Sequence, residues 1–375
     1  MKRLGLYIHI PFCRSKCHYC DFYSMPHPDG ELMRAYTDRL CSDILSYAPL
    51  CTEYVVDSVY FGGGTPTLAD PALLCRVLDT VRGGFHLDPK AEITLECNPA
   101  TGSAEGFHML HTAGFNRVSV GLQSANEREL RALGRVHSFW DCADTLALLR
   151  AAGFENLSVD VMQGIPHATL ESYLETLRAV VSLETEHISA YALSIEEGTR
   201  FWSMRDRLPL PDEDTAREMF FEGAAFLEEH GYDWYEISNF AKKGYASRHN
   251  LKYWNCEEYL GFGPAAYSFF GGERFGNGRD ITAYLRGEAI ECERERIGTL
   301  EAANEFVMLG MRLSGGVSVK TFEKRYPYAF YDTFGAALER FVSTGHVKKT
   351  EDGYAFTPEG FYVSNTILSE VLSFA

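Results

Sequence analysis

The chain has 375 residues, of which 46% are hydrophobic and 23% are charged, and its formal net charge is −17. This length can bury a large core, and the negative charge argues against broad nucleic-acid binding, which needs a basic surface. Cys13 comes too early for a cleaved signal peptide, no apolar run approaches a membrane span, and the ten cysteines lack the spacing of a disulfide scaffold. We therefore expect a cytoplasmic protein.

Short β-rich runs alternate with amphipathic helical segments over the first half of the chain. Six such β-then-α units predict an α/β fold with a parallel sheet and right-handed crossovers. Periodicity alone does not decide whether the sheet closes, stays open or forms a partial barrel. In each case the chemistry should lie where strands end and helices begin. The predicted strands are 4–10, 55–64, 92–98, 117–124, 156–166 and 187–196.

Two further segments follow this predicted core, which we place at residues 1–200. Residues 201–300 lose the alternation and are rich in aromatic side chains. Residues 301–375 carry helical patterns that lead to a hairpin signal around Asp352 and Gly353. Helices followed by a hairpin predict a mostly helical, winged-helix-like module. Because acidic residues outnumber basic ones there, we expect a lid or packing role rather than DNA binding.

Three cysteines, Cys13, Cys17 and Cys20, follow the first predicted strand with C-x3-C-x2-C spacing. Thiolates this close in sequence can share one metal centre, and sulfur ligands suit zinc or an iron–sulfur cluster. A structural zinc site has four protein ligands, and only His18 could complete one here. Three thiolates with one open position instead favour a [4Fe–4S] cluster that leaves one iron for another ligand.

The cysteine spacing resembles the signature of the radical S-adenosylmethionine (SAM) superfamily. The resemblance implies a partial (β/α)6 barrel in which SAM chelates the open iron and is cleaved to a 5′-deoxyadenosyl radical. Glycines in "FGGGTPT", at the end of the second predicted strand, would let the backbone approach a ligand closely. By match to the family, the SAM contacts would be Tyr7, Gly63, Gly64, Thr65, Glu96, Gln123, Arg135 and Asp160, with packing contacts from Tyr19, Val161 and Met162.

The motifs "YIHIPFC", "LECNP", "NRVSVGLQS", "LGRVH" and "DVMQGIP" together resemble the oxygen-independent coproporphyrinogen III dehydrogenase family. True dehydrogenases of that family carry an extra cysteine where this chain has Phe22, and a longer segment before the cysteines. The segment "HNLKYW" at 249–254 resembles instead the HemW-type heme chaperone branch, in which the histidine is implicated in heme binding. His249 can offer an imidazole to iron, whereas Tyr253 and Trp254 offer flat apolar faces. A hydrogen-bonded structural histidine in an aromatic core is the alternative.

These resemblances predict a heme chaperone that binds a SAM-ligated [4Fe–4S] cluster and heme, and that passes heme to acceptor proteins. The expected partners are an electron donor and heme-accepting proteins, membrane-associated respiratory proteins among them, but no nucleic acid. The chain is expected to be a monomer or a homodimer. The first alternative is the dehydrogenase that converts coproporphyrinogen III to protoporphyrinogen IX. An RNA-modifying radical SAM enzyme is disfavoured, because the chain is acidic and has no basic tract interleaved with aromatic residues.

Overall fold

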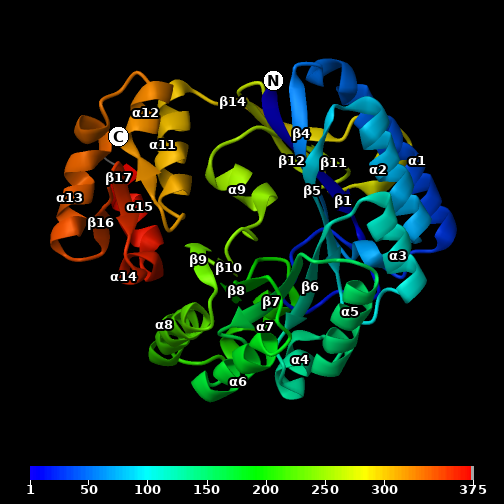
Figure 1. The fold of residues 1–375 in the computed structure, drawn as a ribbon, viewed down its shortest axis with the longest axis horizontal. Coiled ribbons are helices and arrows are strands. Elements are labelled where there is room, and N and C mark those ends of the chain that lie inside the picture. Colours follow the sequence, from blue (N-terminus) through cyan, green and yellow to red (C-terminus); the bar gives the residue numbers. More distant parts are fainter. Residues whose placement is uncertain (373–375) are drawn as a thin grey trace.

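A curved sheet with six parallel strands forms the centre of the computed structural model, which describes residues 1–372. The strands lie in chain order, each parallel to the next, with helices between them (Figure 1). The sheet ends in two edge strands rather than closing, so the predicted partial (β/α)6 barrel is confirmed. The six strands are β1 (Lys2–Ile10), β4 (Tyr54–Gly63), β5 (Leu87–Cys97), β6 (Arg117–Gln123), β7 (Leu157–Gln163) and β8 (His187–Ala192).

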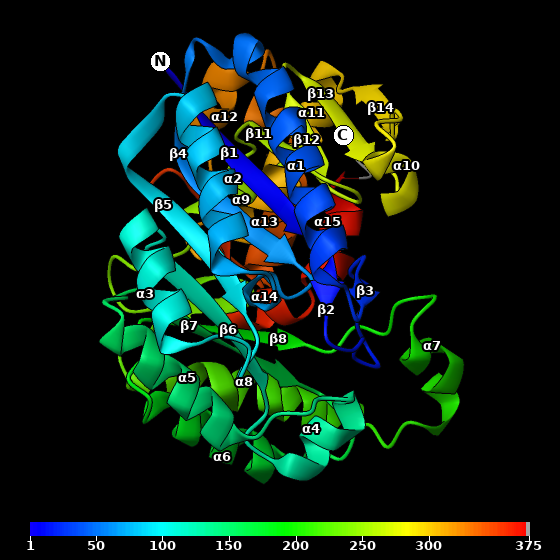
Figure 2. The same ribbon diagram turned by 90° about the vertical axis from the view of Figure 1, so that its right-hand side faces the viewer.

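The outer helices pack on the sheet through apolar stripes at helical spacing. In the helix at 71–84, Leu74, Val77, Leu78 and Val81 are buried, as expected for a helix with one face on the core. Every residue of β6 is buried, which fits a parallel strand covered on both faces. Figure 2 shows the helices lying across the strands. They are α1 (Gly30–Tyr47), α2 (Pro71–Gly84), α3 (Ala104–Ala113), α4 (Glu127–Leu133), α5 (Phe139–Ala151) and α6 (Leu170–Val181).

The segment 201–300, expected as an aromatic-rich extension, adds strands to both edges of the same sheet. Two short strands follow β8 antiparallel at one edge, and four strands continue from β1 at the other. The sheet therefore has twelve strands, with β14 and β9 at its edges. The added strands are β9 (Asp233–Glu236), β10 (Asn239–Ala241), β11 (Tyr259–Phe262), β12 (Tyr267–Phe270), β13 (Glu273–Asn277) and β14 (Glu291–Arg296). The helices of this part are α7 (Arg200–Met204), α8 (Glu213–Glu229), α9 (Arg248–Trp254) and α10 (Ile281–Leu285).

The C-terminal module lies to one side of the sheet, beside α9 (Figure 1). The hairpin predicted around Asp352 and Gly353 is present, because β16 and β17 pair antiparallel and join β15 in a small sheet. Residues 373–375, included in the predicted module 301–375, lie outside the described residues. The module comprises α11 (Thr299–Gly310), β15 (Val317–Ser318), α12 (Val319–Arg325), α13 (Ala336–Ser343), β16 (Val347–Lys349), β17 (Gly353–Phe356), α14 (Pro358–Tyr362) and α15 (Ser364–Leu372), with a π-helical turn at 331–335.

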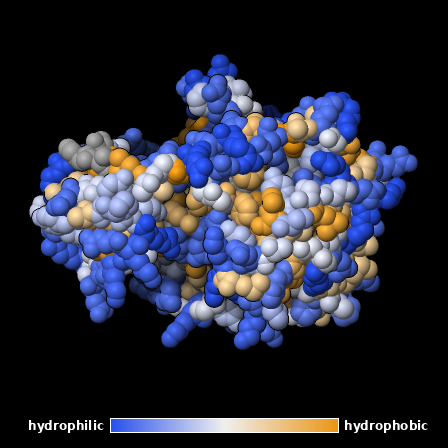
Figure 3. Space-filling model, turned by 90° about the horizontal axis from the view of Figure 1, so that it is seen from above, coloured by the Kyte–Doolittle hydropathy of each residue, from blue (hydrophilic) through white to orange (hydrophobic). Residues whose placement is uncertain are grey.

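Hydrophilic residues predominate on the face of the molecule shown in Figure 3, where hydrophobic patches are scattered over the main body. A hollow separates the C-terminal module from that body (Figure 3). Among residues 1–372, no helix combines the length and the apolar character needed to cross a bilayer.

Candidate functional site

The three cysteines lie in a loop that leaves the end of β1. The short strands β2 (Phe12–Cys13) and β3 (Met25–Pro26) pair in parallel and close this loop at its base. The amides of Gly64 and Thr65 donate to the carbonyls of Ile10 (2.9 Å) and Phe12 (2.7 Å). The loop is therefore held against the carboxyl end of β4, at the edge of a parallel sheet where ligands bind.

A cavity at the carboxyl ends of the parallel strands brings most of the predicted site residues together. Cysteines of the loop form one wall, and residues from the ends of β4 to β8 form the others. Of the residues predicted from the sequence, the cavity is lined by Cys13, Cys17, Tyr19, Cys20, Gly63, Gly64, Glu96, Gln123, Arg135 and Asp160.

The cysteines are suited to a cluster rather than to a single ion. All three are free thiols, and Cys13 Sγ lies 3.5 Å from Thr65 Oγ1. Within residues 1–372, no three histidine, cysteine or carboxylate side chains converge on a point where one metal ion could sit. A cubane does not need such convergence, because each thiolate binds a different iron. Burial raises the pKa of Cys17, and that of Cys20 to about 11, so these thiols need a cation nearby to ionise.

His18, the only side chain that could have completed a zinc site, is engaged elsewhere. Its Nδ1 lies 3.0 Å from the carbonyl oxygen of Ala132, at the end of α4. Its Nε2 lies 2.8 Å from Nη1 of Arg200. Both ring nitrogens are therefore satisfied without a metal, and the histidine ties the cysteine loop to its surroundings.

The glycines at the end of β4 allow the cysteine loop and β5 to approach the same point. Gly63 has a φ of 108°, and a Cβ at this position would lie 2.3 Å from the ring of His9. The Gly63 amide donates to Glu96 Oε2 (2.9 Å), and the Tyr60 hydroxyl donates to Glu96 Oε1 (2.8 Å). Burial raises the pKa of Glu96 to about 7. Glu96 is thus a preorganised carboxyl whose free lone pairs can accept bonds from ligand hydroxyls.

Arg135 brings a positive charge into the cavity with no carboxylate bonded to it. Its Nη1 donates to Asn98 Oδ1 (2.7 Å), and its Nη2 donates to the Tyr19 hydroxyl (2.8 Å). The buried Nε has no hydrogen-bond partner. A guanidinium with neutral neighbours and a spare donor fits a ligand that carries a carboxylate, such as the amino-acid part of SAM.

Gln123 and Asp160 complete the opposite wall. Gln123 ends β6 with a φ of 75°, a conformation that costs energy for a residue other than glycine. The Tyr191 hydroxyl, from β8, donates to Gln123 Oε1 (2.8 Å), and the Ser119 hydroxyl donates to Asp160 Oδ1 (3.0 Å). Burial raises the pKa of Asp160. A strained backbone and a buried carboxyl are both features that are common at functional sites.

Four other predicted residues lie beside the cavity rather than in its lining. Tyr7 belongs to a neighbouring cavity, and Thr65 lies under the cysteine loop, where it accepts a bond from Asn98 Nδ2 (2.7 Å). Val161 and Met162 are core residues, with 0% and 3% of their surface exposed. The sequence interpretation missed Asn98, Ser119 and Tyr191, which all line the cavity. Asn98 directly follows β5 and Tyr191 is the second-last residue of β8, so their positions could have signalled them, whereas Ser119 lies four residues before the end of β6.

His249 lies apart from this cavity, at the start of α9, and only 1% of its surface is exposed. Its Nδ1 lies 2.9 Å from Ser58 Oγ, and its Nε2 lies 2.8 Å from the Tyr253 hydroxyl. Its backbone amide donates to Glu92 Oε1 (3.0 Å). Burial lowers its pKa to about 3, so the imidazole is neutral. Both ring nitrogens are therefore occupied by protein partners.

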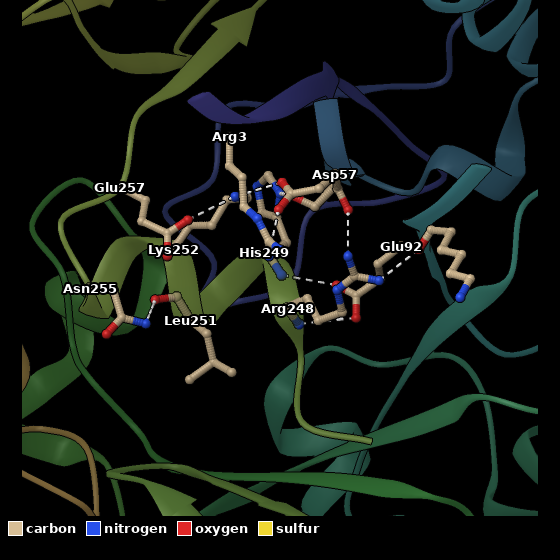
Figure 4. Close-up of polar contacts among 11 residues, drawn as sticks. Arg3, Asp57, Glu92, Arg248, His249, Leu251, Lys252, Asn255 and Glu257 are labelled. Atoms are coloured by element: carbon tan, nitrogen blue, oxygen red, sulfur yellow. Dashed lines mark hydrogen bonds and ion pairs between the residues drawn. The ribbon is translucent and has the colours of Figure 1, made fainter. Parts of the chain in front are cut away.

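Buried charges fix α9 against the sheet (Figure 4). Lys252 Nζ lies 2.6 Å from Asp57 Oδ1 and 2.9 Å from Glu257 Oε2. The side chains of Lys252 and Asp57 are 4% and 6% exposed. A buried pair of this kind holds its helix in one place, since separating the charges leaves each one buried and unpaired.

This chain is similar to known proteins along nearly its whole length. Residues 7–180 match the radical SAM superfamily, and residues 299–363 match the HemN C-terminal domain. The chain is 33% identical to the heme chaperone HemW of Bacillus subtilis, covering 98% of both chains. It is also 33% identical to HemW of Escherichia coli, covering 99% of this chain and 98% of that one.

Two other proteins widen the comparison. Radical S-adenosyl methionine domain-containing protein 1, mitochondrial, of Mus musculus is 34% identical, over 99% of this chain and 87% of that protein. The solved structure of coproporphyrinogen III oxidase (HemN) from Escherichia coli superposes with a TM-score of 0.87 at 24% identity, covering 100% of this chain and 91% of that one. At that identity, the superposition shows the shared fold alone.

Proposed function

The chain belongs to the HemW family of the radical SAM superfamily, and on that premise we propose that it is a heme chaperone, which binds heme and delivers it to acceptor proteins. The observation that carries the proposal is 33% identity to HemW proteins along nearly the full length of both chains. The likeness covers the cysteine loop, the strand ends around it and the C-terminal module alike.

The cavity beside the cysteine loop is the proposed site of a [4Fe–4S] cluster and SAM. Cys13, Cys17 and Cys20 would hold the cluster, and Arg135 would pair with the carboxylate of SAM. Glu96 is placed to accept bonds from hydroxyl groups of the ligand. When bound, the cluster and SAM supply one-electron chemistry that protein side chains cannot provide.

The second candidate is the oxygen-independent coproporphyrinogen III dehydrogenase, and the superposition on HemN is what favours it. That likeness concerns the fold, and one fold can serve several functions. Phe22 occupies the position at which the family resemblance places an extra cysteine in the dehydrogenases, and its side chain lines the cysteine cavity. We therefore rank the chaperone function first.

Iron ligation by His249 stays a prediction. In the structure, Nδ1 would have to give up its contact with Ser58, or Nε2 its contact with Tyr253, before that nitrogen could reach a heme. The heme site is therefore best sought in a cavity near α9 rather than at the imidazole itself.

We propose a cytoplasmic setting, which the free state of all ten cysteines supports. The partners would be an electron donor for the cluster and heme-accepting proteins, including membrane-associated respiratory proteins. A monomer or a homodimer would suffice for this role, and sedimentation of the anaerobically purified protein would distinguish the two.

Two assays on the same anaerobic preparation test the function. The first adds heme to the cluster-loaded protein and follows the Soret band, and we expect uptake of about one heme per chain. The second supplies coproporphyrinogen III, SAM and a reductant, and we expect no protoporphyrinogen IX. Sustained decarboxylation without heme uptake would replace the chaperone with the dehydrogenase.

A further inference from the structure

A second cavity, walled mainly by aromatic side chains, lies next to the cysteine cavity. We call it the tyrosine-lined cavity, and its volume is about 360 Å³, which is within the range of small-molecule sites. Phe22 lines both cavities, so the two lie side by side. The tyrosine-lined cavity is lined by residues that include Tyr7, Phe22, Tyr253, Tyr259, Tyr267 and Arg279.

The aromatic rings come from separate elements and present apolar surface at the opening. Tyr253 of α9 and Tyr259 of β11 meet edge to face, with ring centroids 4.6 Å apart. Phe22 and Tyr267 are 64% and 46% exposed, although large aromatic side chains usually bury most of their surface. Exposed rings around a cavity indicate a site for a flat apolar ligand.

Arg279 is the cation in the lining of this cavity, and it is paired with Asp21. Arg279 donates to both carboxylate oxygens of Asp21, at 3.2 and 2.9 Å. The two side chains are 58% and 40% exposed, so the ion pair contributes little to stability. A ligand carboxylate could therefore replace Asp21 on the same guanidinium. Asp21 directly follows Cys20, so the exchange would release the end of the cysteine loop.

His249 is behind the tyrosine-lined cavity and does not line it. It reaches the cavity through Tyr253, whose hydroxyl lies 2.8 Å from Nε2. Ser58 at Nδ1 and Glu92 at the backbone amide fix the imidazole from the sheet side. The hydrogen bond with His249 thus holds the Tyr253 ring in one position in the cavity wall.

We infer that the tyrosine-lined cavity is where the heme macrocycle docks. The tyrosine rings and Phe22 would pack on the macrocycle, Arg279 would bind a propionate carboxylate in place of Asp21, and His249 would act as a positioning residue through Tyr253. The inference rests on the proposed chaperone function and places its ligand in a cavity that shares Phe22 with the cysteine cavity.

The carboxylate contact is tested by titrating heme and heme dimethyl ester into the cluster-loaded, full-length protein. We expect Arg279→Gln to weaken binding of heme about tenfold. The same variant should bind the ester as the wild type does, because the ester has no carboxylate for Arg279 to bind. Arg286→Gln is the matched control, since Arg286 is 57% exposed, pairs with Glu288 and lies outside the cavity. Equal loss for heme and ester, or no loss for either, would overturn the assignment of Arg279.

The role of His249 is tested by comparing His249→Ala, Tyr253→Phe and the double variant. A positioning role predicts weaker heme binding in each single variant, by about threefold for Tyr253→Phe, with no further loss in the double variant. The Soret maximum of the bound heme should stay in place in all three. A changed Soret maximum in His249→Ala, with wild-type affinity in Tyr253→Phe, would make the imidazole an iron ligand and overturn the positioning role. Tyr253→Phe keeps the ring and the packing, so this variant tests the contact between Tyr253 and His249 even if His249→Ala fails to fold.

These titrations distinguish a failure of the chaperone function from a failure of the proposed heme site. Absence of heme uptake by the wild type would remove the chaperone function itself. Normal uptake that ignores Arg279, Tyr253 and esterification would keep the chaperone and move its heme out of the tyrosine-lined cavity.

Discussion

Replacing Arg135 with alanine should weaken SAM binding while leaving the cluster in place. In the structure, the guanidinium donates to two neutral acceptors, Asn98 and Tyr19, and its buried Nε has no partner. A bound carboxylate would gain charge-assisted hydrogen bonds from this guanidinium. Hydrogen bonds to charged groups contribute about 1.5–3 kcal/mol each. Loss of one corresponds to an increase in Kd of about 10- to 150-fold.

The assay is calorimetric titration of SAM into anaerobically reconstituted protein, with iron content measured on the same samples. Arg131→Ala serves as the control, because Arg131 lies on the adjacent helix α4 and pairs with Glu127 at the surface, where both side chains are 69% exposed. Arg135→Lys should fall between the wild type and Arg135→Ala, since lysine keeps the charge but not the two-pronged geometry. Unchanged SAM affinity in Arg135→Ala would refute the argument and leave Arg135 as a structural link between Asn98 and Tyr19.

Serine at Cys13, Cys17 or Cys20 should abolish the cluster of about four irons per chain, whereas serine at Cys41, Cys75 or Cys142 should not; cluster loss in one of the latter, with the fold intact, would show that the ligand set is wrong. Lys252→Met should lower the free energy of unfolding by up to about 3–5 kcal/mol in urea denaturation, because buried Asp57 then keeps only its longer contact with the exposed Arg3 (3.5 Å), and Asp57→Asn in the same chain should recover most of the loss. Because the pKa of Glu96 is raised from 4.5 to about 7, the folded state holds a proton that the unfolded state releases, so the free energy of unfolding should fall as pH rises from 4.5 to 7. Glu96→Gln should reduce this dependence on pH, and an unchanged dependence would place the proton on another group.

Local signals in the sequence were sufficient for the parallel core, and together with the family resemblance they named many of the residues that line the cysteine cavity. Alternating β-rich and amphipathic runs reflect contacts within one β/α unit, so these runs can be recognised without knowledge of the tertiary structure. The carboxyl ends of parallel strands must share one edge of the sheet, so Glu96, Gln123 and Asp160 could be brought together by topology alone. The cysteine spacing carried its own chemical meaning, because three thiolates within eight residues can share only one centre.

Long-range pairing decided the rest. Strands of the segment 201–300 joined opposite edges of the sheet, a choice that depends on open hydrogen-bonding edges at β1 and β8 rather than on any periodicity in the strands themselves. The sequence pattern "HNLKYW" suggested an imidazole ready for iron, but the fold packs His249 between Ser58 and Tyr253 and turns Tyr253 toward a cavity. The side of α9 that faces the sheet carries the buried Lys252–Asp57 pair and the His249–Ser58 contact, whose partners are far apart in sequence. Burial and hydrogen-bond partners are properties of the assembled chain, so a motif can name the residues of a site while only the tertiary structure decides which of them meets the ligand.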